Sequence, residues 1–161
     1  MSRSLYVLVL LIAFALPCEA DESSNIEVVK AMTEAINDRN LDALDAFVSP
    51  NLVRHSAATP GLNVASLDEF RAFLETDFAT IPDSVQTIDI IFGSGDFVAV
   101  RARYIGTQTG AMGPFPPSGK KMVLPYMGIL RFDDGLIAEI WVEWDNLSAL
   151  TQLGHFPPPD D

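Results

Sequence analysis

The sequence predicts an α+β fold, in which helices come first and the strands of a curved antiparallel sheet follow. Up to residue 78, apolar residues recur at the three- and four-residue spacing of amphipathic helices. From residue 85 to residue 144 they alternate with polar residues, which is the period of strands with one buried face. This change of period, and the order of the two halves, predict helices packed on one face of the sheet.

Three helices are expected before the sheet. The first follows a capping box at Ser24-Asn-Ile-Glu27, and the third follows a second capping box at Ser66-Leu-Asp-Glu69. Between them, residues 41–48 have the apolar spacing of a short helix that ends at Ser49-Pro50. Residues 51–65 contain a Pro-Gly turn and are expected to form a loop.

About four main strands are expected, and two of the connections between them have the composition of hairpin turns. The turns are Gly93-Ser-Gly95 and Asp133-Asp-Gly135, while a longer loop rich in glycine and proline separates the two middle strands. After the last strand, Asp145 can cap a final short helix. The expected strands cover residues 85–92, 97–109, 121–132 and 136–144, the long loop covers residues 110–119, and the final helix covers residues 146–153.

The composition is that of one folded domain. The chain has 161 residues, of which 48% are apolar, so it can bury a sizeable core. A formal net charge of −12 repels the phosphates of nucleic acids and anionic lipid surfaces, and neither is expected as a partner. With two histidines, one cysteine and no glycine-rich phosphate loop, no metal or other cofactor is expected.

The first 20 residues have the layout of a secretory signal peptide. Arg3 supplies the positive charge, an apolar run extends from Leu5 to Leu16, and small residues precede a cleavage point after Ala20. We therefore expect export to the periplasm or the extracellular space, with removal of residues 1–20. A retained membrane anchor and a lipid anchor on Cys18 are the alternatives.

The mature chain is expected to be a domain of residues 21–156 followed by a loose tail at residues 157–161. Side chains alternate across a strand, so the even-numbered residues of the last three strands share one face. That face carries almost no charge and is expected to point toward the helices, where it can form an apolar pocket. The expected pocket residues are Tyr104, Gln108, Tyr126, Gly128, Ile140, Val142 and Trp144.

The odd-numbered face of the same strands carries charged residues, but it also carries large apolar ones. Met127, Ile129 and Trp141 lie among arginines and glutamates on this outer face. Large apolar groups in such a setting predict a protein partner, most simply a second copy of the chain in a homodimer. Scattered surface apolar residues are the alternative.

Several motifs in the second half of the chain resemble those of one known family. They are, in order, Gly106-Thr-Gln-Thr-Gly110, Met112-Gly-Pro-Phe-Pro-Pro-Ser-Gly-Lys120, Leu130-Arg-Phe-Asp-Asp-Gly-Leu-Ile-Ala-Glu139, Trp141-Val-Glu-Trp-Asp145 and Gln152-Leu-Gly154. Their order and spacing resemble the SnoaL-like polyketide cyclases and ester cyclases of the nuclear transport factor 2-like superfamily, over about residues 26–156. The resemblance implies a conical α+β barrel around a deep cavity, and dimers formed through the outer sheet face. It also implies intramolecular aldol ring closure, performed without metal or cofactor by an aspartate with a histidine nearby.

The sequence departs from this family where the chemistry should be. By the resemblance, the catalytic histidine corresponds to Gly128 and the catalytic aspartate to Val142, and neither residue can move a proton. A third pocket histidine of the family corresponds to Gln108. The cyclase mechanism therefore cannot be transferred to this chain residue by residue.

Other polar residues remain as candidates for chemistry. His55 could act as a general base near neutral pH, or it could be a hydrogen-bonded loop residue. Gln108 and Tyr126 could orient a carbonyl or hydroxyl group, or they could be internally satisfied core residues. Glu143 is a candidate only if a bulge turns it inward, and Asp145 is better explained as a helix cap.

Three functions follow from these candidates. The first is an enzyme acting on a small hydrophobic carbonyl compound by cyclisation, isomerisation or hydrolysis. The second is a module that binds a small apolar molecule without catalysis. The third is a dimeric interaction domain with no useful cavity.

Overall fold

The computed structural model describes residues 22–157 and confirms the α+β fold. The helices are α1 (Glu22–Asn37), the 3₁₀ helix η1 (Leu41–Ala46), α2 (Leu67–Thr80) and α3 (Asn146–Leu153). The strands are β1 (Val48–His55), β2 (Val85–Ser94), β3 (Phe97–Thr107), β4 (Lys121–Asp133) and β5 (Leu136–Trp144). The expected signal peptide and residues 158–161 of the expected tail lie outside the described residues.

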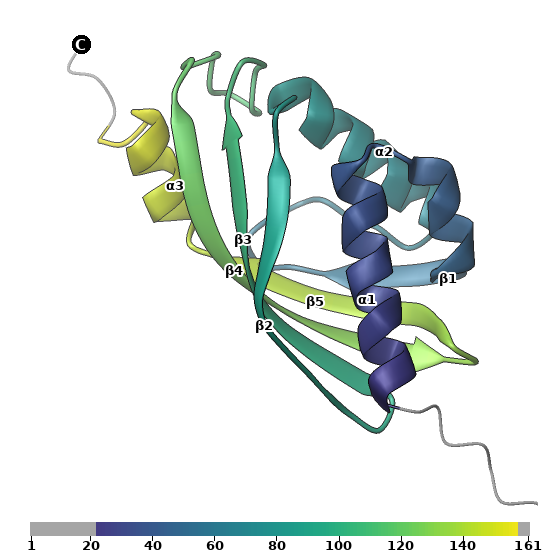
Figure 1. Ribbon diagram of the computed structural model, residues 1–161. Coiled ribbons are helices and arrows are strands. Elements are labelled where there is room, and N and C mark those ends of the chain that lie inside the picture. Colours follow the sequence, from purple (N-terminus) through teal and green to yellow (C-terminus); the bar gives the residue numbers. More distant parts are fainter. Residues whose placement is uncertain (1–21, 158–161) are drawn as a thin grey trace, which may run out of the picture.

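The strands form one curled sheet in the order β1-β5-β4-β3-β2. Neighbours from β2 to β5 are antiparallel, as expected, but β1 runs parallel to β5 and makes the sheet mixed. Helices α1 and α2 lie across the concave side, and α3 lies near the far end of β4 (Figure 1). The sheet is not closed into a barrel, because β1 and β2 are its two edges. This arrangement is consistent with the expected conical fold.

The region from residue 41 to residue 65 differs from the expectation. The expected second helix is the short 3₁₀ helix η1, and part of the expected loop is strand β1. Pro50 lies inside this strand, where the register with β5 is irregular between Val48 and Val53. The strand is held by pairing with residues 137–141, far along the chain, which no local pattern can reveal. Only the tertiary context makes it a strand.

The helix ends test the capping predictions. Ser66 Oγ accepts a hydrogen bond from Glu69 N at 3.1 Å, which confirms the second capping box. Asp145 Oδ1 accepts from Ser148 N at 3.1 Å, so Asp145 is the expected cap of α3. The first capping box is wrong, because α1 already includes Glu22 and Ser24 lies within its first turn.

The core confirms which sheet face points inward. Even-numbered residues of β3 and β4 pack against α1 and α2, and the odd-numbered residues between them are more exposed. Leu130, for example, is 4% exposed, whereas its neighbour Ile129 is 47% exposed. A smaller apolar cluster joins β4 to α3 through Met122, Leu124 and Leu153. Among residues 22–157, no helix is long and apolar enough to cross a membrane.

Candidate active site and ligand cavity

A cavity of about 830 Å³ lies between the concave sheet face and the helices. It has the size of a site for a small organic molecule, and most of its wall is apolar. Six of the seven expected pocket residues line it: Tyr104, Tyr126, Gly128, Ile140, Val142 and Trp144. The wall also contains polar residues that were not expected there, among them Arg54, Asp77 and Gln86.

Asp77 brings a carboxyl group into this apolar cavity. It lies in the last turn of α2, and its Oδ2 accepts a hydrogen bond from the Tyr104 hydroxyl at 2.8 Å. Burial raises the pKa of Asp77, although the hydrogen bond from Tyr104 and the charge of Arg39 oppose the shift. Burial and the Asp77 charge also raise the pKa of Tyr104, which keeps its phenol neutral. A carboxyl group with a raised pKa is a stronger base than an ordinary aspartate.

Gln86 and Tyr126 form a second polar pair on the same wall. The Tyr126 hydroxyl donates to Gln86 Oε1 at 2.5 Å, and burial raises the pKa of Tyr126 to about 12. Gln86 Oε1 is occupied by this bond, whereas Gln86 Nε2 has no hydrogen-bond acceptor within residues 22–157. Gln86 therefore offers the cavity a neutral N–H donor.

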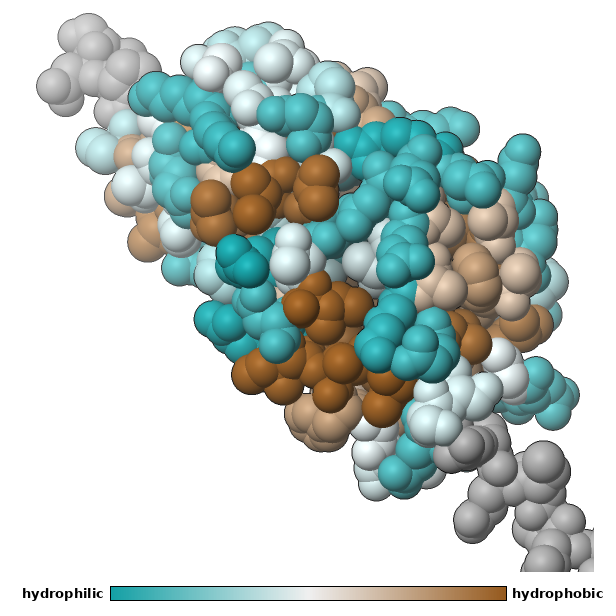
Figure 2. Space-filling model, viewed as in Figure 1, coloured by the Kyte–Doolittle hydropathy of each residue, from teal (hydrophilic) through white to brown (hydrophobic). Residues whose placement is uncertain are grey.

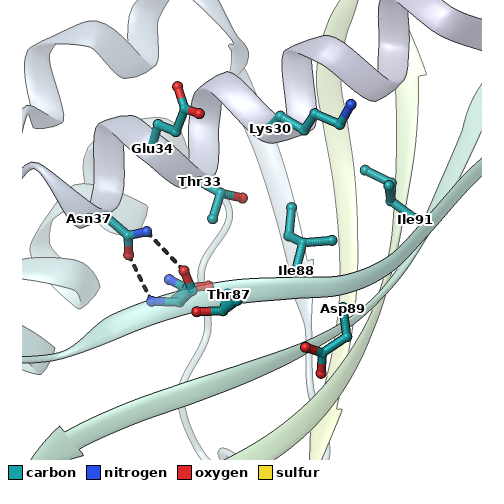
Figure 3. A pocket seen from close by; sticks show the side chains of 9 residues that line it. Lys30, Thr33, Glu34, Asn37, Thr87, Ile88, Asp89 and Ile91 are labelled. Carbon is teal, nitrogen blue, oxygen red and sulfur yellow. Dashed lines mark hydrogen bonds between the residues drawn. The ribbon is translucent and has the colours of Figure 1, made fainter.

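The backbone of Gln86 is fixed by helix α1. Asn37 Nδ2 donates to Gln86 O at 2.9 Å, and Gln86 N donates to Asn37 Oδ1 at 2.8 Å (Figure 3). Both bonds use the free edge of β2, which is an edge strand of the sheet. A shallower pocket of about 380 Å³ lies beside this contact, between α1 and β2 (Figure 3). The Asn37 side chain thus holds the backbone of Gln86 in position, and the side chain of Gln86 takes no part in this contact.

The two polar pairs are neighbours in the sheet. Gln86 on β2 lies directly opposite Tyr104 on β3, so their side chains share one face at close range. Tyr126 lies one strand further, opposite Ala102. Together Asp77, Tyr104, Gln86 and Tyr126 form a group that we call the polar row. It places a base and a hydrogen-bond donor on the same stretch of cavity wall.

Arg54 lies on the opposite edge strand, β1, and is 7% exposed. Its Nη1 donates to Thr59 Oγ1 at 3.1 Å. Its guanidinium carbon lies 4.6 Å from the centre of the Phe73 ring and 5.8 Å from that of Trp144. Burial lowers the pKa of Arg54, against the raising effect of the Glu143 charge.

The positions where the family resemblance implies catalytic residues form a plain apolar wall. Gly128 on β4 lies directly opposite Val142 on β5, and both line the cavity. A Cβ on Gly128 would lie 3.2 Å from a methyl group of Val100, so little space is left there for a larger side chain. Any proton transfer in this cavity must therefore use other residues.

The expected placement of Gln108 in the pocket is wrong. Its side chain is fully buried, and Nε2 donates to Gly110 O and Pro116 O, both at 3.1 Å. His155 Nε2 lies 2.8 Å from Gln108 Oε1, so the amide is saturated by the protein. Gln108 thus holds the loop of residues 110–119, whose residues 111–115 line the cavity. It shapes the cavity without lining it.

His55 and Glu143 also lie outside the cavity lining, which corrects their expected catalytic placement. His55 Nε2 lies 3.2 Å from Glu139 Oε2, and the ring stacks on Trp141 on the outer face. Glu143 accepts hydrogen bonds from Ala57 N at 2.7 Å and Ala58 N at 3.1 Å. Strand alternation directs residues 139, 141 and 143 outward, and the bulge that would have turned Glu143 inward is absent from the register of β5 at this point.

A signal for Asp77 is present in the sequence. The buried stripe of α2 continues from Leu67 through Phe70 and Leu74, at spacings of three and four. Continuing those spacings gives Asp77 and then Ile81, so a carboxylate occupies a core position of the stripe. A charged residue on an apolar stripe is a candidate functional group. Arg54 could not be found this way, because its strand was not expected.

The described residues contain no group of three or more His, Cys, Asp or Glu side chains able to hold a metal ion. The polar groups on which we base the chemistry of the cavity are the Asp77 carboxyl group, the Gln86 amide, the phenols of Tyr104 and Tyr126 and the Arg54 guanidinium. These groups can bind polar atoms of an apolar molecule and move one proton. The fold and the cavity define a small α+β domain of the kind that encloses a ligand between a curled sheet and its helices.

Comparison with known proteins identifies the family. Residues 26–153 match the family model described as SnoaL-like polyketide cyclase, and the chain belongs to this family. Membership supports a cyclase- or isomerase-type ligand-binding domain. A search of curated proteins gave no match.

Solved structures agree with this assignment. IdmH from Streptomyces antibioticus, a candidate polyketide cyclase, is 26% identical with a TM-score of 0.71, covering 81% of this chain and 98% of IdmH. TsrD from Streptomyces laurentii is also 26% identical, with a TM-score of 0.75 and coverage of 84% and 98%. A Catenulispora acidiphila protein with a ketosteroid isomerase-like fold is 23% identical, with a TM-score of 0.68 and coverage of 80% and 92%. This last likeness concerns the fold alone.

Proposed function

We propose that the cavity binds a small hydrophobic carbonyl compound, and that Asp77 removes a proton from the carbon next to its carbonyl group. The observation that carries this proposal is the Asp77 carboxyl group, which lies in an apolar cavity, has a raised pKa and is held by the Tyr104 hydroxyl. A carboxylate whose pKa is raised by an apolar setting is a better base toward a carbon acid than an ordinary aspartate.

The polar row supplies both ends of this step. The C–H bond breaks, its proton goes to the Asp77 carboxylate, and its electron pair moves onto the carbonyl oxygen to form an enolate. Gln86 Nε2 is available to donate a hydrogen bond to that oxygen, because it has no acceptor among the described residues. Tyr104 keeps the carboxylate of Asp77 in position, and Tyr126 keeps the side-chain amide of Gln86 in position.

The same first step serves both reaction types that the family suggests. An enolate can attack a second carbonyl group of the molecule, which is aldol ring closure, or it can be reprotonated at another carbon, which is isomerisation. The likeness to IdmH, described as a candidate polyketide cyclase, supports the first reaction type. Gly128 and Val142 then serve as apolar wall against the body of the ligand.

The test is deuterium exchange at the acidic carbon of 2-tetralone, followed by NMR in heavy water. The protein should accelerate exchange, and Asp77→Asn should slow it about 100-fold or more, because general base catalysis is worth about 10²–10⁴-fold. Asp89→Asn is the matched control, since Asp89 pairs with Arg101 and Arg103 and does not line the large cavity. Exchange that survives Asp77→Asn unchanged would contradict the proposal.

A binding module without catalysis is the second candidate function. The observation that favours it is the pair Gly128 and Val142, which leaves the positions implied by the family resemblance without a proton-transfer group. Calorimetry separates the two functions: this candidate requires that 2-tetralone binds the protein while its exchange rate stays that of the buffer.

We also propose that the domain is exported. The support is the charged, apolar and small-residue pattern of residues 1–20. Mass spectrometry of the protein recovered from outside the cytoplasm should give a chain that begins near Asp21. A chain that begins at Met1 in that fraction would favour the retained anchor, and a lipid mass on Cys18 would favour the lipid anchor.

A homodimer through the outer sheet face is the remaining proposal. Met127 is 66% exposed and Ile129 is 47% exposed, and Trp141 carries the stacked ring of His55 beside them. Figure 2 shows the molecule from the side on which α1 lies in front of the sheet, and this side has hydrophobic patches of its own, separated by hydrophilic side chains. Sedimentation should give the mass of two chains, and Ile129→Glu should give the mass of one, whereas the control Leu147→Glu on α3 should not. One chain for the unaltered protein would contradict the dimer.

A further inference from the structure

Arg54 places a positive charge in the ligand cavity without a carboxylate to pair with. It is 7% exposed and lines the cavity, yet no carboxylate of the described residues lies within ion-pair distance of it. A guanidinium stays charged under all ordinary conditions, so this charge cannot be removed by losing a proton. Burying this charge without a partner lowers the stability of the protein. A binding site can retain such a buried charge when the ligand supplies the partner.

The hydrogen bonds of Arg54 leave most of its donors unused. Nη1 donates to Thr59, while Nε and Nη2 have no acceptor in the part of the chain that the structure describes. No fully buried side-chain nitrogen or oxygen among those residues lacks a partner, so these two groups keep some accessible surface. Arg54 lines the cavity, and we infer that this surface lies on the cavity side.

The neighbours of Arg54 hold the guanidinium without neutralising it. Phe73 and Trp144 offer their ring faces to the cation, at 4.6 Å and 5.8 Å from the guanidinium carbon. Glu143 is near enough to influence its pKa, but both carboxylate oxygens of Glu143 accept from the backbone N–H groups of Ala57 and Ala58. Glu143 therefore fixes the loop that carries Thr59, and Thr59 in turn positions Arg54.

We propose that Arg54 is an anion-binding residue and that the ligand of this cavity is a hydrophobic carboxylate. The planar fork of a guanidinium matches the two oxygens of a carboxylate, and the apolar wall accepts the rest of the molecule. This inference rests on the proposed function only in using the same cavity. Arg54 is on strand β1 and Gln86 is on β2, at opposite edges of the sheet. In the combined view the substrate is a keto acid, with its carboxylate at Arg54 and its carbonyl group at the polar row.

The test compares two probes of equal size, 2-naphthoate and the uncharged 2-naphthamide, by isothermal titration calorimetry. Naphthoate should bind the unaltered protein about tenfold tighter or more, because a charge-assisted pair replaces a neutral one. Arg54→Gln should remove this preference, and Arg54→Lys should retain part of it. Arg71→Gln is the matched control, because it removes a guanidinium that pairs with Asp45 and Asp68 away from the cavity.

Equal affinity of the two probes for the unaltered protein, or no detectable naphthoate binding, would overturn the proposal. So would an Arg54→Gln protein that keeps the preference. Should Arg54→Gln fail to fold by circular dichroism, the comparison of probes on the unaltered protein still decides. The outcome is separate from that for Asp77: a protein that prefers naphthoate but does not exchange 2-tetralone retains the anion site and loses the proposed proton transfer.

Discussion

Two aspartates on opposite sides of the sheet show how the fold divides its polar residues. Asp89, on the outer face, pairs with Arg101 at 3.1 Å and with Arg103 at 2.8 Å, and the hydrogen bond from Arg103 lowers its pKa. Asp77, in the cavity, accepts a side-chain hydrogen bond only from the neutral Tyr104 hydroxyl within residues 22–157, and burial raises its pKa. The carboxyl group on the outer face is therefore paired with arginines and is a weaker base than usual. The carboxyl group in the cavity has a neutral partner and is a stronger base than usual.

The cations follow the same division. Arg131 on the outer face pairs with Glu139 at 2.8 Å, and Glu139 also contacts His55. Arg54 in the cavity has no such partner among the described residues and lies over the rings of Phe73 and Trp144. Charged residues that match one another stabilise the outer surface only slightly. The charged residues that lack an oppositely charged partner in the cavity are available to a ligand, and we therefore place the function in the cavity.

The largest expected difference between the two faces concerns stability. Leu130→Ala on the inner face of β4 should lower the free energy of unfolding by about 2–5 kcal/mol, because it opens space in a packed core. Ile90→Ala on the outer face should lower it by about 1 kcal/mol or less, because Ile90 is 53% exposed. Denaturant titration of both variants measures this, and similar losses for the two would mean that the faces are wrongly assigned.

Much of this division could be predicted from the sequence, because alternation along a strand needs only local information. The period of two placed Tyr104, Tyr126 and Trp144 inside and Met127 outside. The same alternation gave Gln108 an inward direction, but it could not show that loop carbonyls and His155 saturate its amide.

The residues that were missed depend on contacts between distant parts of the chain. Arg54 enters the cavity because β1 pairs with β5, a pairing of residues about 85 positions apart. His55 was a candidate general base in an expected loop, and the strand that replaces the loop turns its side chain to the outer face of the sheet. Asp77 was a missed residue with a local signal, the carboxylate on the apolar stripe of α2.

The two aspartates should also give opposite dependences of stability on pH. The raised pKa of Asp77 means that the folded protein holds its proton more tightly than the unfolded chain. Its stabilising contribution is present below about pH 4 and is lost as the pH rises through the folded pKa. Asp77→Asn should therefore gain stability relative to the unaltered protein as the pH rises from acid to neutral.

Asp89→Asn should behave in the reverse way, since the pKa of Asp89 is lowered by its arginine partners. Its contribution is present above the pKa of the unfolded chain and is lost as the pH falls through the folded pKa. This variant should be less stable than the unaltered protein at neutral pH and approach it in acid. Thermal unfolding at a series of pH values measures both variants, and the same trend for both would refute the contrast between the two sites.

The smallest effect is expected for His55→Ala, and it bears directly on which face does the chemistry. His55 is an exposed residue that contributes one contact to Glu139 and one stacked ring to Trp141, so its loss should cost about 1 kcal/mol or less. If proton transfer occurs in the cavity, this variant should exchange 2-tetralone at the rate of the unaltered protein, although histidine is the usual general base near neutral pH. A loss of exchange comparable to that in Asp77→Asn would move the reaction to the outer face. The polar row would then be a buried structural network, since a histidine stacked on Trp141 cannot reach the cavity through the sheet.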